Sequence, residues 1–175
     1  MSQSLLPFAA TSEPSPPRPT PSGLLRADGT SIDDLELPEL VWTISLWRPY
    51  AGLVMAGHKS LETRTWPWPY GVTWLGIWAA AHIDSEAMKR LGQLAEDHVG
   101  PGRVLLGIVK VMGHRPLVPA DEPQSLFYGP DRYAWELARP LVFRRPVTVV
   151  EARLKKLPQK FARVGRRVIV EALAA

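Results

Sequence analysis

The chain of 175 residues contains no cysteine. Disulfide bonds, thiol nucleophiles and thiolate metal ligands are therefore excluded. The sequence also lacks an apolar run of the roughly 18 residues that a membrane-spanning helix needs, and its amino terminus lacks the charged-then-apolar pattern of a secretory signal. We therefore expect a cytoplasmic protein with no membrane partner.

Histidine is sparse, with four residues: His58, His82, His98 and His114. No two of them have the helical spacing of a zinc site, and no cysteine can complete one. We therefore expect no metal and no cofactor. His98 is expected at a helix end, whereas His82 at a strand end and His114 in a loop are candidate proton acceptors.

Carboxylates are scarce in the carboxyl-terminal third. Between residues 139 and 167, ten lysines and arginines accompany the single carboxylate Glu151. Such a surface attracts polyanions, and nucleic acid is the obvious example. The alternative is a well-solvated basic face without a partner. A nucleic-acid groove in this region would comprise Arg144, Arg145, Arg153, Lys155, Lys156, Lys160, Arg163, Arg166 and Arg167.

Residues 1–40 have the opposite character. They contain six acidic residues, two arginines and seven prolines. This composition offers little apolar surface to offset the entropy of ordering, so we expect a disordered tail or an extended segment lying over the domain. Residues 41–175 have the length of one ordinary domain.

The apolar pattern after residue 40 predicts about six strands and two main helices. Helices are expected at 49–57, where Gly57 suits a left-handed stop, and at 84–98, capped by Asp84 or Ser85. Strands that outnumber helices without regular alternation predict an α+β fold with a mixed, largely antiparallel sheet that closes into a small barrel. Seven segments have strand character, from which a barrel of about six strands is expected: 41–46, 60–66, 73–83, 103–112, 133–139, 147–154 and 168–172.

The segment ISLWRPYAGLVMAGHKSLETR, residues 44–64, contains a strand, a short proline-containing helix and the motif Gly-x-Lys-x-x-Glu-x-Arg. It resembles the opening of the ASCH family, a branch of the PUA-like superfamily. The similarity extends over roughly residues 42–172. The resemblance implies a PUA-like mixed β-barrel with helices over its openings, and RNA or a nucleotide-like ligand as the partner. The motif falls on Gly57, Lys59, Glu62 and Arg64.

These motif residues predict a recognition pocket. Glu62 and Arg64 are two apart in a strand and so project from the same face, where they can hold each other and leave Lys59 free to meet a phosphate or a carbonyl. The alternative is an ion-pair cluster on the surface. The candidate ligand-binding residues are Lys59, Glu62, Arg64, Trp66, Trp68, His82 and Tyr50.

Seven tryptophans need separate interpretations. Trp66 and Trp68 lie in a proline turn, so we expect them to be exposed and able to stack on a base. Aromatic residues at alternating strand positions are more often core than binding platform. On that ground the core is expected to contain Trp42, Trp47, Trp74, Trp78 and Trp135.

The same resemblance leaves a hydrolase open as the alternative. Some ASCH-like proteins are amidohydrolases of acylated cytidine nucleosides that use a lysine, a threonine three residues later and a distant glutamate. Here Glu62 stands at the position of that threonine, and Thr63 and Thr65 are expected on the opposite face. If the chain is an enzyme, its catalytic residues would be Lys59, as a base whose pKa is lowered by burial, and Glu62, which opposes that lowering. A ribonuclease would use the same basic pocket with a histidine.

Overall fold

The structure, a computed structural model, describes residues 24–26, 40–71, 73–148, 154–155 and 167–169. Its strands are β1 (Leu24–Arg26), β2 (Leu40–Arg48), β3 (Leu61–Arg64), β4 (Thr73–Ile83), β5 (Val104–Pro116), β6 (Tyr133–Thr148), β7 (Leu154–Lys155) and β8 (Arg167–Ile169). Its helices are α1 (Tyr50–Met55), α2 (Ser85–Leu91), α3 (Gln93–His98), the 3-10 turn η1 (Pro119–Asp121) and α4 (Glu122–Ser125).

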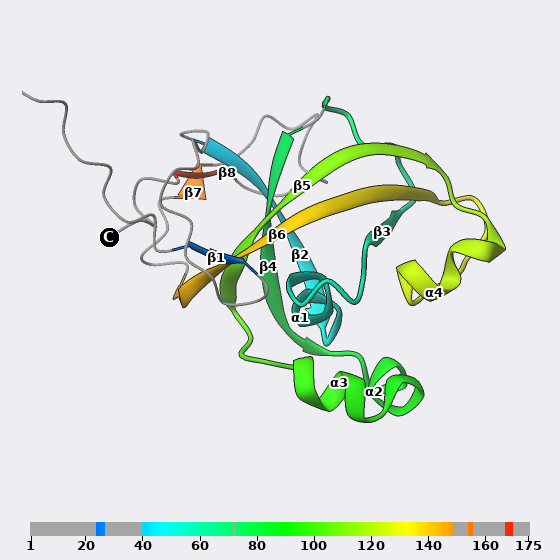
Figure 1. Cartoon of the computed structure of the whole chain (residues 1–175), viewed down its shortest axis with the longest axis horizontal. Coiled ribbons are helices and arrows are strands. Elements are labelled where there is room, and N and C mark those ends of the chain that lie inside the picture. Colours follow the sequence, from blue (N-terminus) through cyan, green and yellow to red (C-terminus); the bar gives the residue numbers. More distant parts are fainter. Residues whose placement is uncertain (1–23, 27–39, 72, 149–153, 156–166, 170–175) are drawn as a thin grey trace, which may run out of the picture.

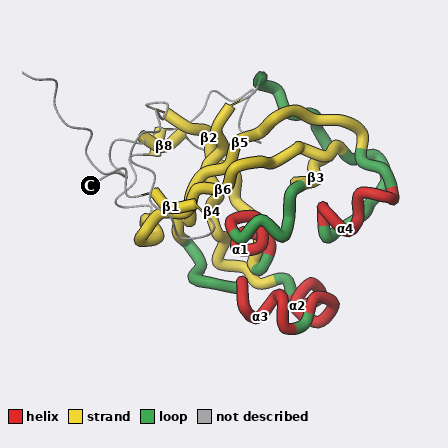
Figure 2. Tube along the Cα trace, in the orientation of Figure 1, coloured by secondary structure: helices red, strands yellow, loops and turns green. Residues whose placement is uncertain are grey.

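All eight strands belong to one mixed sheet, in the order β1-β6-β5-β4-β2-β8-β7, with β3 paired to β6. Strands β2 and β4 run parallel, and the other pairs are antiparallel. The sheet curls around α1 (Figures 1 and 2). The predicted mixed α+β sheet is therefore confirmed. Its closure is not, because no pairing among the described strands joins β2 to β3, and the sheet is a half-barrel.

Helix α1 lies in the hollow of this curl, where it packs against β2, β4, β5 and β6. Its buried face consists of Ala51, Leu53, Val54 and Met55. The chain leaves the helix at Gly57, whose φ of +82° is the left-handed conformation that glycine adopts without a steric penalty. The predicted helix and its stop are confirmed.

The single helix expected at 84–98 is divided into α2 and α3. Gly92 separates them, with a φ of +53° that is incompatible with a continuous helix. The predicted cap is confirmed, because the Asp84 Oδ1 atom accepts a hydrogen bond from the Ala87 N–H at 3.0 Å. None of the helices among the described residues is long and apolar enough to span a membrane.

Strand β6 runs without interruption through the region where two separate strands were expected. The register against β5 shifts between Ile108 and Lys110, opposite Arg139 and Pro140. Arg139 has a φ of +51°, so a bulge accommodates the proline inside the strand. Of the expected strand at 147–154, residues 147–148 end β6 and residues 154–155 are β7, while residues 149–153 lie outside the described ranges.

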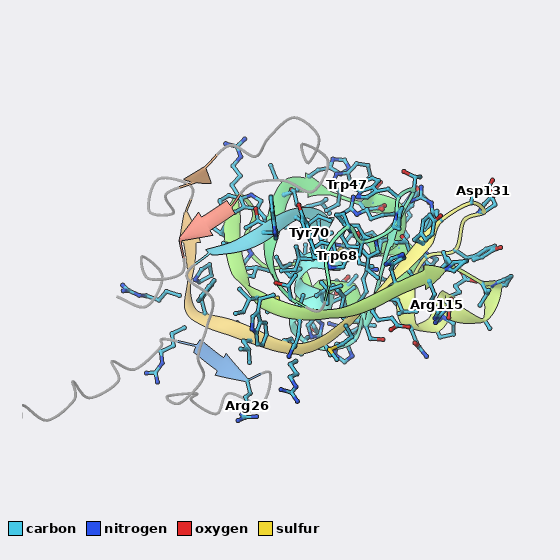
Figure 3. All side chains as sticks on the ribbon, turned by 90° about the horizontal axis from the view of Figure 1, so that it is seen from above. Arg26, Trp47, Trp68, Tyr70, Arg115 and Asp131 are labelled. Carbon is cyan, nitrogen blue, oxygen red and sulfur yellow. The ribbon has the colours of Figure 1, made fainter. Side chains whose placement is uncertain are left out.

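The core fills the space between the curled sheet and α1. In Figure 3, Trp68 and Tyr70 lie inside the curl, whereas Trp47 lies closer to the edge of the molecule. Within the predicted tail, residues 24–26 are described, and they pair with β6 as β1. The buried core cluster includes Trp42, Ile44, Leu46, Val54, Trp68, Leu75, Ile77, Val109, Val111 and Trp135.

Candidate functional site

A cavity of about 290 Å³ lies at the open side of the half-barrel, between β2 and β3. Residues from six parts of the chain surround it: β2, α1, the connection from α1 to β3, β3 itself, the residue before α2, and the connection from β5 to β6. The unpaired edge of the sheet is therefore where the structure leaves room for a ligand. The lining residues are Ser45, Leu46, Trp47, Tyr50, Lys59, Glu62, Thr63, Arg64, Asp84, Phe127 and Arg132.

Lys59, Glu62 and Arg64 meet at one wall of this cavity. The Lys59 Nζ atom lies 3.2 Å from Glu62 Oε2, and the Arg64 Nη2 atom lies 2.8 Å from Glu62 Oε1. Lys59 is 3% exposed and Glu62 6%. The carboxylate is thus held between two cations in a largely dry environment, where such pairs interact more strongly than at the surface.

Lys59 is not free, in contrast to the expectation from sequence. Its ammonium group also donates to the Leu61 carbonyl, and it lies 5.9 Å from the centroid of the Tyr50 ring. Burial lowers the pKa of Lys59, because charge is costly away from water, and the nearby Arg64 adds to this effect. Glu62 acts in the opposite direction without cancelling the lowering. The Lys59 proton is therefore more easily lost than that of an ordinary lysine.

The predicted exposure of the proline-turn tryptophans is wrong for Trp68. Trp68 is 2% exposed, and its ring packs edge-on against Trp135 at 4.8 Å, because the turn folds back into the curl. Trp66 is half-buried, also against the core, and the Arg64 guanidinium lies 5.6 Å from its ring. Neither Trp66 nor Trp68 lines the cavity.

Trp47, which was expected in the core, is 55% exposed and lines the cavity. Ile44 and Leu46 are buried, and by strand alternation Ser45 and Trp47 point outward. The outward position of Trp47 could therefore have been predicted from the sequence by strand alternation. His82 is exposed too and packs edge-on against Trp47 at 4.3 Å, but it does not line the cavity.

Tyr50 provides a hydroxyl group at another wall. Its oxygen accepts a hydrogen bond from Arg90 Nη2 at 3.2 Å. Burial, and then the charge of Asp84, raises the pKa of Tyr50, although Arg90 opposes the change. Tyr50 is therefore a protonated phenol at neutral pH, and a hydrogen-bond donor next to the carboxylate that caps α2.

Residues 117–132, which we call the cover segment, bring Phe127 and Arg132 to the cavity. Near the start of this segment, the Asp121 carboxylate accepts two hydrogen bonds from the side chain of Arg115 in β5, at 2.6 and 2.7 Å. These bonds, with one from the Val118 N–H, lower the pKa of Asp121 to about 2. The bidentate pair therefore fixes the beginning of the segment to β5.

Two further hydrogen bonds hold the cover segment to α2 and to the residue that precedes β3. Arg90 Nη2 donates to the Leu126 carbonyl at 2.7 Å, and the Ser60 N–H donates to the Gln124 carbonyl at 3.1 Å. The Arg132 guanidinium lies 5.0 Å from the Phe127 ring. Sequence reasoning missed both of these cavity residues, because no sequence pattern shows how the proline-bearing connection between β5 and β6 folds.

Three other expectations concern the remaining polar candidates. Thr63, expected to face away from Glu62, also lines the cavity, whereas Thr65 does not. His114 is exposed and contacts Tyr133 at 5.8 Å, away from the cavity lining. His98 ends α3, as expected. The described residues contain no group of three or more histidine, aspartate or glutamate side chains placed to hold a metal ion.

The predicted nucleic-acid groove is described in part. Arg144 and Arg145 are exposed in β6. Lys155 and Arg167 lie at paired positions of β7 and β8. Outside the described residues lie Arg153, Lys156, Lys160, Arg163 and Arg166.

No family model matches the chain, and no curated protein matches it. Among solved structures, the chain is similar to ASCH proteins of Zymomonas mobilis. The crystal structure of ASCH from that organism has a TM-score of 0.45 and 17% identity, over 62% of this chain and 73% of that one.

Two variants of the Zymomonas mobilis protein give related values. A serine-to-alanine variant has a TM-score of 0.42 and 17% identity, over 67% of this chain and 82% of that one. A tyrosine-to-phenylalanine variant has a TM-score of 0.39 and 15% identity, over 62% and 75%. These are distant similarities of fold, and the chemistry of the cavity follows from this chain's own residues.

Proposed function

We propose that the cavity binds one nucleoside or nucleotide unit, either within single-stranded RNA or as a free modified nucleotide. The observation that carries this proposal is the row of Lys59, Glu62 and Arg64 along the wall of a 290 Å³ cavity. A volume near the lower end of the range for small-ligand sites suits a single nucleotide unit. This ligand class is also the one that the sequence resemblance implies.

The lining residues divide into groups suited to the two halves of a nucleotide. Arg64, whose side chain is 22% exposed, and Arg132 can meet a phosphate. Phe127 offers an exposed aromatic surface at the rim, on which the base of this nucleotide can stack. Glu62 has its carboxylate oxygens directed at Lys59 and Arg64, so its main effect is to hold both cations in place.

A second candidate function is hydrolysis of a nucleoside or of RNA in the same cavity. The observation that favours it is the burial of Lys59, which lowers the pKa of its amine despite the neighbouring Glu62. A neutral amine could take a proton from an attacking water or hydroxyl group, while Arg64 stabilises the negative charge that develops. The amidohydrolase pattern has a threonine three residues after its lysine, whereas this chain has Glu62 at that position, which counts against hydrolysis.

The test compares wild type with Lys59→Met, which keeps the side-chain volume and removes the charge. Both are incubated with labelled single-stranded RNA and with acylated cytidine, and binding and product are measured. We expect Lys59→Met to weaken binding by about tenfold or more, while the exposed Lys89→Met control binds like wild type. Equal affinity of wild type and Lys59→Met, in proteins with matching thermal melts, would refute the proposal. Product that disappears in the variant would establish hydrolysis.

A further inference from the structure

Trp47 is more exposed than any other large apolar side chain among the described residues. It occupies an outward position of β2 while its neighbour Leu46 is 4% exposed. Covering this exposed indole would remove a large apolar surface from water, which is favourable. Because Trp47 also lines the cavity, the covering group is expected to be continuous with the ligand of that cavity.

His82 forms the second part of this surface. Strands β2 and β4 are parallel neighbours, and the register pairs Arg48 with Ile83, one residue beyond Trp47 and His82. The His82 ring lies edge-on to Trp47, with centroids 4.3 Å apart and planes at 62°. This contact restrains the indole without covering it, and the adjacent Ile83 is 42% exposed. Trp47 and His82, here called the Trp47 platform, are thus a held but open aromatic surface.

The Arg64 cation lies close to the Trp47 platform. The Arg64 Nη2 atom is 3.5 Å from the carbonyl oxygen of Ser45, which precedes Trp47 by two residues on β2. Two strand residues span about 6.6 Å. The guanidinium is therefore within one nucleotide's reach of the platform, where a phosphate joining two nucleotides would pass.

We propose that the Trp47 platform stacks the base adjacent to the one in the cavity, so that the smallest complete ligand is a dinucleotide. The inference rests on the proposed function of the cavity. It specifies that the ligand is at least two nucleotides long. It also specifies that the ligand is single-stranded, because a base can reach the platform only when it is unpaired. Stacking is tolerant of base identity, so the platform adds affinity at every sequence.

The test measures the affinity of the four nucleoside 5′-monophosphates and of pApA, pCpC, pGpG and pUpU by titration calorimetry. For wild type, a dinucleotide is expected to bind about 5- to 150-fold more tightly than its mononucleotide, the gain from one stacked base. Trp47→Ala should remove most of this ratio and Trp47→Phe should retain it. Met112→Ala, at an exposed apolar residue away from the cavity, should leave the ratio unchanged.

Two negative results have different meanings. Mononucleotide binding that depends on Lys59, together with a dinucleotide ratio near one or a ratio that Trp47→Ala does not reduce, would overturn the platform and leave the cavity's proposed function intact. Absence of binding by every mononucleotide and dinucleotide would overturn both. Because Trp47 is a surface residue, its replacement is expected to leave the thermal melt unchanged. An unchanged melt would show that a reduced ratio of dinucleotide to mononucleotide affinity is not caused by a folding defect.

Discussion

Lys59 is positioned by its main chain before its side chain makes any contact. The N–H groups of His58 and Lys59 both donate to the Leu53 carbonyl, at 2.9 and 3.1 Å, where the chain leaves α1. The next residues enter β3, where the lysine ammonium group meets the carboxylate of Glu62, three residues further along the chain. Placing a single cation in a buried position in this way is costly unless a carboxylate accompanies it.

The lowered pKa of Lys59 predicts a dependence of stability on alkaline pH. An unfolded lysine keeps an ordinary pKa near 10.5, whereas the folded one loses its proton at lower pH. Between the two values the unfolded chain binds more protons, so this group makes the fold more stable as pH rises. The difference in unfolding free energy between wild type and Lys59→Met should therefore shift in favour of wild type from pH 8 to pH 10.5, as measured by urea unfolding.

Lys89→Met is the matched control for this measurement, because Lys89 has a 76% exposed side chain and contacts Glu86 on the surface of α2. Its stability should follow the wild-type curve with a constant offset. Parallel curves for wild type and Lys59→Met over the same pH range would contradict the buried position of the ammonium group.

At the scale of single residues, the sequence predicted the ion pairs better than the aromatic residues. Strand alternation places Glu62 and Arg64 on one face, and this local rule holds in the structure. The exposure of Trp47 follows from the same rule. The burial of Trp68 does not, because it depends on how a proline turn folds back against Trp135, a contact between residues far apart in sequence.

At the scale of elements, α1 and the β5–β6 pair approach each other around Gly107. A Cβ atom at this position would lie 2.1 Å from the Leu141 carbonyl oxygen and 2.6 Å from Met55 Cε. The methionine can move, but the strand carbonyl cannot do so without disturbing the sheet. Gly107→Ala should therefore reduce the free energy of unfolding by about 3 kcal/mol, near the upper end of overpacking effects, as measured by urea unfolding.

Gly71→Ala is the control for this substitution, because a Cβ atom there would meet nothing within 4 Å. It should change stability by less than about 0.5 kcal/mol. A Gly107→Ala protein as stable as Gly71→Ala would mean that β5 and β6 are farther apart than the structure places them.

The sequence predicted the elements with regular periodicity and missed those that depend on irregular backbone. Strand β4 begins and ends where the sequence predicts, at Thr73 and Ile83. The division of the second helix required a positive φ at Gly92, and the continuity of β6 required one at Arg139. The cover segment has no regular sequence periodicity. Its position depends on hydrogen bonds from Arg115, Ser60 and Arg90, which lie in other parts of the chain. It is therefore the part of the cavity that pattern reasoning could not place.

At the scale of the whole molecule, the cavity and the basic end of β6 are separate surfaces. Strand β3 pairs with residues 133–136 at the start of β6. Arg144 and Arg145 lie eight or more residues farther along that strand, roughly 25 Å at the usual strand rise. We therefore propose that these arginines contact phosphates of a longer RNA, outside the nucleotide held in the cavity.

This separation predicts different salt responses for short and long ligands. Each phosphate contact on a single strand adds about −0.7 to the slope of log affinity against log salt. Replacing the two arginines in Arg144→Glu/Arg145→Glu should make the slope for a 12-nucleotide RNA shallower by about one to two units, and should weaken all sequences alike. Mononucleotide affinity should change less than twofold, because the cavity lies at the other end of the strand.

The control for the single variant Arg145→Glu is Lys89→Glu, which makes the same change in net charge at an exposed residue of α2, away from β6. If this variant reduced the slope as much as the β6 variant, binding would depend on total charge instead of a defined path for the strand. A slope near zero for the wild type would exclude the basic end of β6 from binding altogether. The ligand would then be a small nucleoside confined to the cavity, whose charged lining consists of Lys59, Glu62, Arg64, Asp84 and Arg132.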